Sequence, residues 1–310
     1  MTAILVLGSE GTIGRPLVAG LTKRGYDVTT ADLVHTNRPN HARCDVSRYR
    51  QIKKLFDQNE FEFVYNLAAE FGKKNGEDFY EQLWSSGVVG LKNLLDIQKK
   101  KKFRMVHFSS SEIYGSIEPP TGFLREDLSE TMSLFQENDY AISKWVNELQ
   151  IRNAHTKTMV IRLFNSYGPG EYYTPYRSVV SLFIYRALHD LPYNVYLDYH
   201  RVFMHSDDLV RTLCNLESHF KSGETYNIGG EEYVEVKKVS DMILKYLGKD
   251  DSLVTYLEKD VHSVTNKRPD IAKAKRDLGH KLLVPLSVGI PQTIEWQKKV
   301  YFGEKTCSRT

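Results

Sequence analysis

The fold is decided by the stretch Ala3-Ile-Leu-Val-Leu-Gly-Ser-Glu-Gly-Thr-Ile-Gly14 near the amino end of the chain. Its first residues are apolar and favour extended structure, which predicts a buried strand. Gly8, Gly11 and Gly14 follow, and an amphipathic helical pattern begins directly after them. Glycines let the backbone turn tightly and approach a pyrophosphate, which the free amides at the start of a helix can bind. The stretch therefore predicts a dinucleotide-binding turn.

The next predicted strand, Asp27 to Ala31, ends in Asp32, which lies 18 residues after Gly14. A carboxylate at about this spacing accepts hydrogen bonds from a ribose hydroxyl. It would also repel a 2′-phosphate, so NAD is favoured over NADP. We expect Arg38 to be an ordinary loop residue and Glu10 to point to solvent, because its charge would oppose a pyrophosphate.

Strand and helix patterns then alternate along the first half of the chain, which predicts a parallel sheet with helices on both faces. Small residues after the strand at 63–67 leave room for a cofactor. The predicted cofactor-binding residues beyond the glycines and Asp32 are Asp45, Val46, Leu67, Ala68 and Ala69. Further elements are expected as a long helix from Phe79 to Gln98, a strand from Met105 to Phe108, a helix from Asp139 to Ala154 and a strand from Met159 to Leu163.

Composition places the 310-residue chain among ordinary globular proteins, with 41% hydrophobic and 26% charged residues. A net charge of +3 is too small to indicate nucleic acid or an anionic membrane as partner. Cys44, Cys214 and Cys307 are far apart and lack metal-ligand spacing, so we expect free thiols and no metal site. Neither a signal peptide nor a long apolar run is evident, which favours the cytoplasm and no membrane contact.

The stretch from Arg104 to Gly115 predicts a strand that ends in a serine-rich loop, the position where open α/β sheets bind ligands. Tyr140 and Lys144 lie four residues apart on a predicted helix and so share one face. We expect the lysine ammonium to lower the phenol pKa toward neutrality, so that the phenolate removes a proton from a sugar hydroxyl as hydride leaves the same carbon. Ser110 would share a hydrogen bond with the phenolic oxygen.

The order of these motifs, together with Leu67-Ala-Ala69, Ser109-Ser-Ser-Glu112 and Phe164-Asn-Ser-Tyr-Gly-Pro169, resembles the extended short-chain dehydrogenase/reductases that act on nucleotide sugars. The resemblance implies a Rossmann doubly wound parallel sheet with a smaller α/β substrate-binding lobe. It also implies tightly held NAD, a nucleotide-diphosphate sugar substrate and a homodimer. The expected division is an NAD-binding domain at 1–165 and a substrate lobe at 166–310, with segments near 202–228 returning to the first domain.

Site residues carried over from the resemblance fall into a catalytic set and a substrate set. Ser110, Tyr140 and Lys144 would be the catalytic trio, and the tyrosine and lysine would also contact NAD. Asn165 and Arg201 would hold the sugar diphosphate, with charge-assisted bonds from the arginine. The remaining residues expected at the substrate are Ser111, Arg177, Lys267 and Arg268.

Glu112 separates the activities that the resemblance allows. In relatives that are 4,6-dehydratases, a glutamate here removes the proton on carbon 5 of the oxidised sugar, whereas 4-epimerases need no carboxylate. UDP-glucuronate decarboxylases also carry a Ser-Glu pair at the positions of Ser111 and Glu112. We expect a 4,6-dehydratase; a 4-epimerase, a decarboxylase-like enzyme and a net 4-dehydrogenase remain alternatives. A non-catalytic NAD-sensing scaffold is an alternative of a different class. The base and the hexose stay open.

Overall fold

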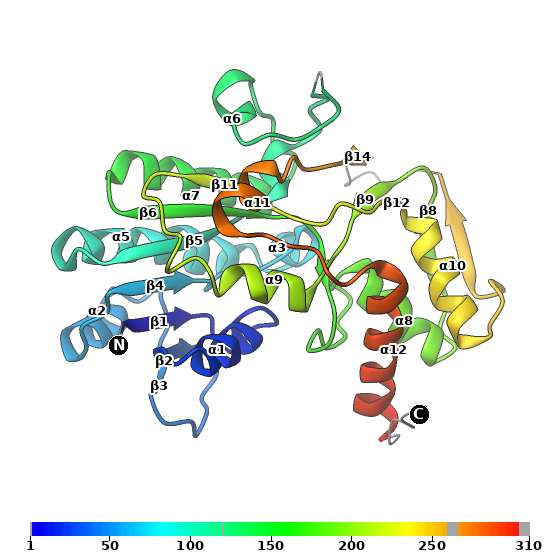
Figure 1. Cartoon of the computed structure of the whole chain (residues 1–310), viewed down its shortest axis with the longest axis horizontal. Coiled ribbons are helices and arrows are strands. Elements are labelled where there is room, and N and C mark those ends of the chain that lie inside the picture. The colour runs from blue at the N-terminus through cyan, green and yellow to red at the C-terminus, as the bar shows by residue number, and fades with distance from the viewer. Residues whose placement is uncertain (1, 120, 259–265, 304–310) are drawn as a thin grey trace.

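The computed structural model describes residues 2–119, 121–258 and 266–303 of the chain. In this part of the chain, seven strands form one central sheet, and every neighbouring pair in it is parallel (Figure 1). Across the sheet the strands are β11 (Thr225–Ile228), β6 (Thr158–Leu163), β5 (Arg104–Ser110), β4 (Phe63–Asn66), β1 (Ala3–Leu7), β2 (Asp27–Asp32) and β3 (His41–Arg43).

Helices cover both faces of this sheet, which explains the continuous apolar runs in its strands. In β1, Ile4 and Val6 belong to one hydrophobic core, while Leu5 and Leu7 belong to the other. Helices α1 (Gly14–Lys23), α9 (Ser206–Leu213) and α11 (Ala272–Leu278) contribute to the first core, and α2 (Tyr49–Gln58), α5 (Gly90–Lys101) and α7 (Asp139–Ala154) to the second. The predicted doubly wound α/β fold is confirmed.

The strand order reverses direction between β1 and β4, which are paired neighbours. After β1 the chain proceeds to β2 and β3 on one side, and from β4 onward it builds the other side. The loops that follow β1 and β4 therefore part at this point and leave a crevice at the carboxyl edge of the sheet.

Residues 225–228 form the outermost strand, β11, next to β6, so this part of the chain lies with the main sheet.

The single helix expected from Phe79 to Gln98 is wrong in detail. The chain forms α3 (Lys73–Asp78), α4 (Tyr80–Gln82) and a π-helical segment, Leu83–Val89, before α5 begins at Gly90. A Cβ atom on Gly90 would lie 2.7 Å from a methyl carbon of Val46, so this helix packs closely on the loop after β3. Tertiary packing, which sequence periodicity does not report, thus interrupts the regular helix.

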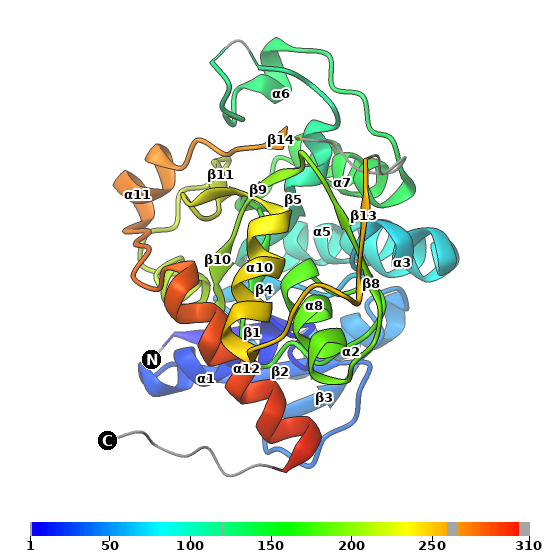
Figure 2. The same cartoon turned by 90° about the vertical axis from the view of Figure 1, so that its right-hand side faces the viewer.

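A smaller lobe lies to the right of the sheet in Figure 1, and Figure 2 shows its helices side by side. Its core is formed mainly by α8 (Val179–Leu188), α10 (Val236–Leu247) and α12 (Leu286–Phe302). Short strands outside the seven-stranded sheet form three small pairings: β8 (Tyr193–Tyr196) with β13 (Val254–Leu257), β9 (His200–Val202) with β12 (Tyr233–Glu235) and β14 (Asn266–Lys267), and β7 (Ser166–Tyr167) with β10 (Met204–His205). A surface excursion carries the short helix α6 (Leu128–Thr131).

Two of the three cysteines lie in the part of the chain that the structure describes. Cys44 and Cys214 are buried free cysteines, and Cys307 lies outside the described residues. Within the described ranges, no helix has the length and apolar composition needed to span a bilayer. The same ranges hold no cluster of three or more side chains of the types that commonly ligate metals.

A buried ion pair crosses from β6 to α7. The guanidinium of Arg162 lies 2.7 Å and 3.0 Å from the two carboxylate oxygens of Glu148, and both side chains are almost fully shielded from solvent. Ser109, at the end of β5, donates a 2.6 Å hydrogen bond to the same carboxylate. Arg162 also donates to the hydroxyl of Tyr114, which in turn donates to Asn227 on β11. This network ties α7 to the carboxyl ends of β5, β6 and β11.

We predict that Arg162→Met destabilises the protein by about 3 to 5 kcal/mol, because it leaves the Glu148 carboxylate buried without a counter-charge. The double variant Arg162→Met with Glu148→Gln should lose clearly less, since no uncompensated charge remains. Urea unfolding followed by circular dichroism measures both. As a control, Arg125→Met removes an exposed pair with Asp127 and should cost less than about 1 kcal/mol. Equal losses for the single and double variants would contradict this account.

Candidate active site

The glycine turn lies between β1 and the start of α1. Gly8 has a φ of +77°, a conformation that side chains disfavour, and a Cβ there would lie 2.8 Å from the backbone of Leu67 and Ala68. A Cβ on Gly14 would lie 2.2 Å from the carbonyl oxygen of Gly8. Only glycine fits at these positions, so the backbone amides at the start of α1 face the crevice without side chains in the way. This cradle suits a pyrophosphate.

Asp32 ends β2 beside this turn, as its spacing predicted. Its two carboxylate oxygens accept hydrogen bonds from the backbone N–H groups of Glu10, at 2.9 Å, and Val34, at 3.0 Å. The carboxylate is therefore held in place at the carboxyl end of β2, where a ribose hydroxyl could donate to it. The negative charge also disfavours a ribose that carries a 2′-phosphate.

The expectation that Glu10 points to solvent is wrong. Its side chain is 3% exposed, and its Oε2 accepts from Arg15 at 3.2 Å and from Arg38 at 2.8 Å. Since both arginines are partly exposed and neutralise the carboxylate, its charge is no longer an obstacle to a bound pyrophosphate. Arg38 does lie in a loop, but the loop serves to deliver this guanidinium to Glu10.

Adjoining cavities run along the carboxyl edge of the sheet and share the side of the crevice formed by Leu67, Ala69 and Phe71. One cavity contains Asp32 and, from the predicted set, Asp45, Val46 and Ala68. A second contains the glycine turn, including Gly8, Gly11 and Gly14. A third, with a volume of about 460 Å³, contains Ser110, Tyr140 and Lys144. A carboxylate, an amide cradle and a polar end in this order fit the ribose, pyrophosphate and nicotinamide portions of NAD.

Tyr140 and Lys144 lie on the first turns of α7, whose amino end is capped by the side chain of Asn138. The ammonium of Lys144 donates a 2.9 Å hydrogen bond to the carbonyl oxygen of Phe108 on β5 and lies 5.7 Å from the centre of the Tyr140 ring. Ser110, which ends β5, accepts a hydrogen bond from the N–H of Glu112. The helix and the strand end thus bring these three side chains into one cavity.

The expectation of a lowered tyrosine pKa is wrong for this state of the protein. Burial raises the pKa of Tyr140 to about 12, although its hydrogen bond with Ser110 opposes the increase, and the charge of Glu112 adds to it. Burial also lowers the pKa of Lys144 to about 8, against the opposing effect of Glu148. Helical spacing correctly predicted a shared face, but it did not report that the ammonium is bound to a backbone carbonyl.

Glu112 lies in the same cavity and is flanked by lysines from distant segments. Its Oε1 pairs with the ammonium of Lys267 and its Oε2 lies 3.2 Å from that of Lys73. Burial alone would raise the pKa of Glu112, but the charges of Lys267 and Lys73 lower it to about 2. A carboxyl group with a pKa this low is ionised near neutral pH.

Lys73 is a cavity residue that the sequence reasoning missed. The available signal was its position at the start of α3, a few residues after β4, because strand ends at this edge of the sheet converge. Lys267, expected at the substrate, is buried on β14, and burial lowers its pKa to about 8 against the opposing charge of Glu112. Its contact is with the candidate catalytic carboxylate.

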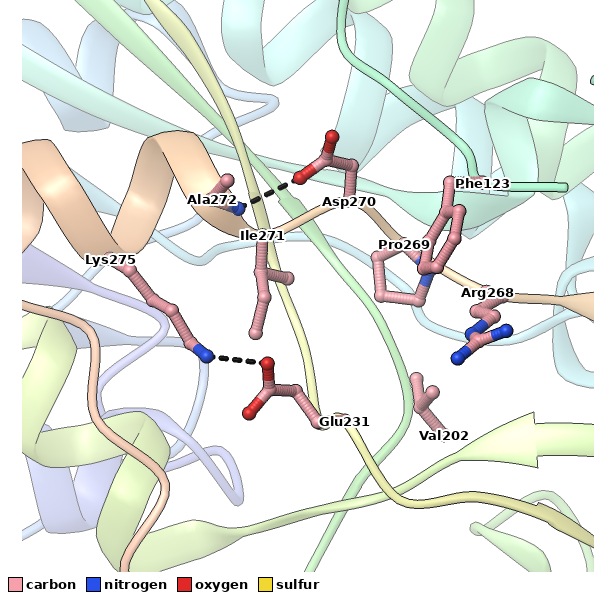
Figure 3. Close-up of a pocket in the computed structure, with 10 residues that line it drawn as sticks. Phe123, Val202, Glu231, Arg268, Pro269, Asp270, Ile271, Ala272 and Lys275 are labelled. Atoms are coloured by element: carbon pink, nitrogen blue, oxygen red, sulfur yellow. Dashed lines mark hydrogen bonds and ion pairs between the residues drawn. The ribbon is translucent and has the colours of Figure 1, made fainter. Parts of the chain in front are cut away.

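Most other predicted substrate residues line the catalytic cavity, namely Ser111, Asn165, Arg177 and Arg201. Arg268 does not. Its guanidinium carbon lies 4.3 Å from the ring centre of Phe123 and 5.3 Å from that of Tyr233. It lines a different cavity, which the ion pair between Lys275 and Glu231 also lines, on the side away from Arg268 (Figure 3). The role expected for Arg268 therefore has no support from its position, because adjacent residues on β14 and beyond face opposite ways.

Known proteins are similar in sequence to this chain over almost its whole length. The chain is 27% identical to a dTDP-glucose 4,6-dehydratase of Salmonella typhimurium, over 94% of this chain and 92% of that protein. It is 26% identical to a UDP-N-acetyl-alpha-D-glucosaminuronate decarboxylase of Bacillus cytotoxicus, over 96% and 98% of the respective chains.

Solved structures show the same fold. The UDP-glucose 4-epimerase of Thermotoga maritima, determined with UDP-glucose, superimposes with a TM-score of 0.86 at 23% identity and covers 96% of this chain and 99% of its own. The model of the NAD dependent epimerase/dehydratase family matches residues 4–229, which span the sheet, the glycine turn and the catalytic cavity. The chain belongs to the NAD-dependent epimerase/dehydratase family.

Proposed function

We propose that this protein is a nucleotide-sugar 4,6-dehydratase. The observation that carries the proposal is the ionised carboxylate of Glu112 in the same cavity as Ser110, Tyr140 and Lys144. An enzyme that only inverts carbon 4 needs no such base, whereas the removal of water from a sugar does. The names of the curated relatives support a sugar nucleotide as the substrate class.

The proposed steps assign the proton transfers to Tyr140 and Glu112. NAD, when bound, supplies a reversible hydride acceptor. Tyr140 takes the proton of the carbon 4 hydroxyl as that carbon is oxidised to a ketone. Glu112 then takes the proton on carbon 5, which the new ketone has acidified, and the hydroxyl on carbon 6 leaves as water with the proton that Tyr140 took from the carbon 4 hydroxyl. Glu112 returns its proton to carbon 5 as hydride returns to carbon 6.

Tyr140 must be deprotonated to act in the first step, and its raised pKa opposes this. The ammonium of Lys144 therefore has to act on the phenol more strongly than in the present arrangement, in which it is bound to Phe108. The presence of both side chains in the cavity argues against a non-catalytic scaffold, because a scaffold would have no need for a tyrosine and a lysine that face the serine at the end of β5.

A decarboxylase is the second candidate, and the ammonium groups of Lys73 and Lys267 favour it. A carboxylate on carbon 6 of the sugar would be attracted by these charges, although Glu112 opposes it. The two reactions give different products from different substrates, so one experiment separates them.

We predict that the purified enzyme, given NAD and a panel of UDP-, GDP-, CDP- and dTDP-hexoses with UDP-glucuronate, yields a product lighter by one water. Mass spectrometry measures this directly. Loss of carbon dioxide would instead establish the decarboxylase, an isomer of equal mass the epimerase, and loss of two hydrogens with NADH release the net dehydrogenase.

The Glu112→Gln variant should lose water elimination by roughly 100-fold or more, because it lacks the base. It should still oxidise carbon 4, so NADH absorbance should appear on mixing with substrate. Glu118→Gln, at an exposed position in the following loop, is the matched control and should keep full activity. Full dehydration by the Glu112 variant would contradict the proposal.

We also predict that Lys267→Met moves the acid limb of the pH–rate profile to higher pH. The variant removes a charge that lowers the pKa of Glu112, so burial should then raise that pKa by about 1 to 3 units. Activity should fall at a higher pH than in the unmodified protein, because the base is lost by protonation. Lys275→Met removes a surface ammonium paired with Glu231 and should leave the profile unchanged. An unshifted acid limb in the Lys267 variant would contradict the assignment of Glu112 as base.

A homodimer is a further part of the proposal. The π-helical segment and α7 expose Val89, Ile142 and Leu149, which are 49%, 36% and 40% accessible. Apolar side chains on adjacent helices support a helix-to-helix interface between two copies. Leu149→Glu should shift the protein to monomer in analytical ultracentrifugation, and a monomeric unmodified protein would contradict the proposal.

A cytoplasmic location also stays a proposal, which cell fractionation would test.

A further inference from the structure

Arg177 occupies a fixed position at the border of the smaller lobe. Ser178 caps the amino end of α8, and both the N–H and the hydroxyl of Ser178 donate to the buried carboxylate of Glu171, at 3.1 Å and 2.6 Å. The loop from Glu171 to Ser178 is therefore closed on itself. Arg177 directly precedes the capping residue, so these bonds restrain its backbone.

The side chain of Arg177 reaches from the lobe across to the NAD-binding domain. Its guanidinium carbon lies 4.2 Å from the ring centre of Phe71, which follows β4. Its neighbour Tyr176 also crosses, by donating a 2.9 Å hydrogen bond to Asp78 at the end of α3. The stacked ring fixes the plane of the guanidinium and leaves its edge available for hydrogen bonds.

Cavity lining distinguishes Arg177 from Arg201, the other arginine in the catalytic cavity. Arg177 lines both that cavity and the one that contains Gly8, Gly11 and Gly14, whereas Arg201 lines only the catalytic cavity. The Nε of Arg177 is buried and has no hydrogen-bond partner among the described residues. An arginine stays charged in proteins, so this donor requires an acceptor, and the amide cradle opposite it indicates an anion.

We propose that Arg177 binds the pyrophosphate of NAD from the side of the substrate lobe, opposite the glycine turn. Arg201 is then left for the diphosphate of the sugar nucleotide. The guanidinium forms charge-assisted hydrogen bonds to the pyrophosphate, which would hold the cofactor between both parts of the protein. This assignment differs from the contact with the substrate that the sequence analysis expected for Arg177, and it holds whichever sugar reaction the enzyme performs.

The test compares the affinities of NAD and of nucleoside diphosphates for protein freed of bound cofactor. Arg177→Met should raise the Kd of NAD by about 10-fold or more, since loss of a charge-assisted bond is worth about 1.4 kcal/mol or more. The Kd values of UDP and dTDP should not change. Isothermal titration calorimetry measures both. Adenosine, which lacks the pyrophosphate, should bind the variant and the unmodified protein equally.

Matched arginine variants complete the design. Arg186→Met, on α8 in the same lobe, removes a bond to the carbonyl of Pro192 and should leave both affinities unchanged. Arg201→Met should show the reverse pattern, with weaker UDP or dTDP binding and unchanged NAD binding. If Arg177→Met does not fold, Arg177→Lys keeps the charge but not the fork, and should give a smaller rise in the Kd of NAD.

An unchanged Kd for NAD in the Arg177 variants would overturn the proposal. So would a loss of nucleoside diphosphate binding, whether alone or together with that of NAD, because Arg177 would then serve the substrate. These outcomes do not depend on catalysis, so they are distinct from a failure of the proposed dehydration.

Discussion

The ion pair between Arg162 and Glu148 joins the elements that carry the reactive groups. Glu148 lies one turn after Lys144 on α7, and it accepts a hydrogen bond from Ser109, the neighbour of Ser110 on β5. This buried carboxylate, together with the hydrogen bond from Lys144 to Phe108, therefore fixes the position of the tyrosine and lysine relative to the serine. Because that carboxylate is neutralised by an equally buried arginine, the cost of its desolvation is offset, and the contact can hold a helix against a strand end.

In the catalytic cavity, burial and neighbouring charges have opposing effects on the pKa of Glu112. Burial acts against ionisation of Tyr140, Lys144 and Glu112 alike, but only Glu112 has ammonium groups close enough to reverse the effect. The cavity thus holds an ionised carboxylate beside a phenol that keeps its proton. These are different starting states for two groups that the proposed reaction uses in sequence, and the difference arises from neighbours that come from other segments of the chain.

The cofactor crevice belongs to both parts of the molecule. The glycine turn and Asp32 form one side of it, and the loop that ends in Ser178 forms another, tied to the smaller lobe by Glu171. Tyr176 and Arg177 make contacts with residues that follow β4. A ligand in the crevice would therefore contact the loop that directly precedes α8. Through this loop, a bound cofactor would contact the substrate lobe.

Local patterns in the sequence were enough to determine the parallel sheet, the glycine turn, the place of Asp32 and the shared face of Tyr140 and Lys144. Each depends on residues close together in the chain, through apolar runs, glycine geometry or helical spacing. Only the tertiary structure decided that Glu10 is buried between arginines, that Lys73 and Lys267 meet on Glu112, that Arg268 faces away and that Arg177 borders the glycine turn. These features depend on contacts between distant segments, and pKa values and burial follow from all the neighbours of a group at once.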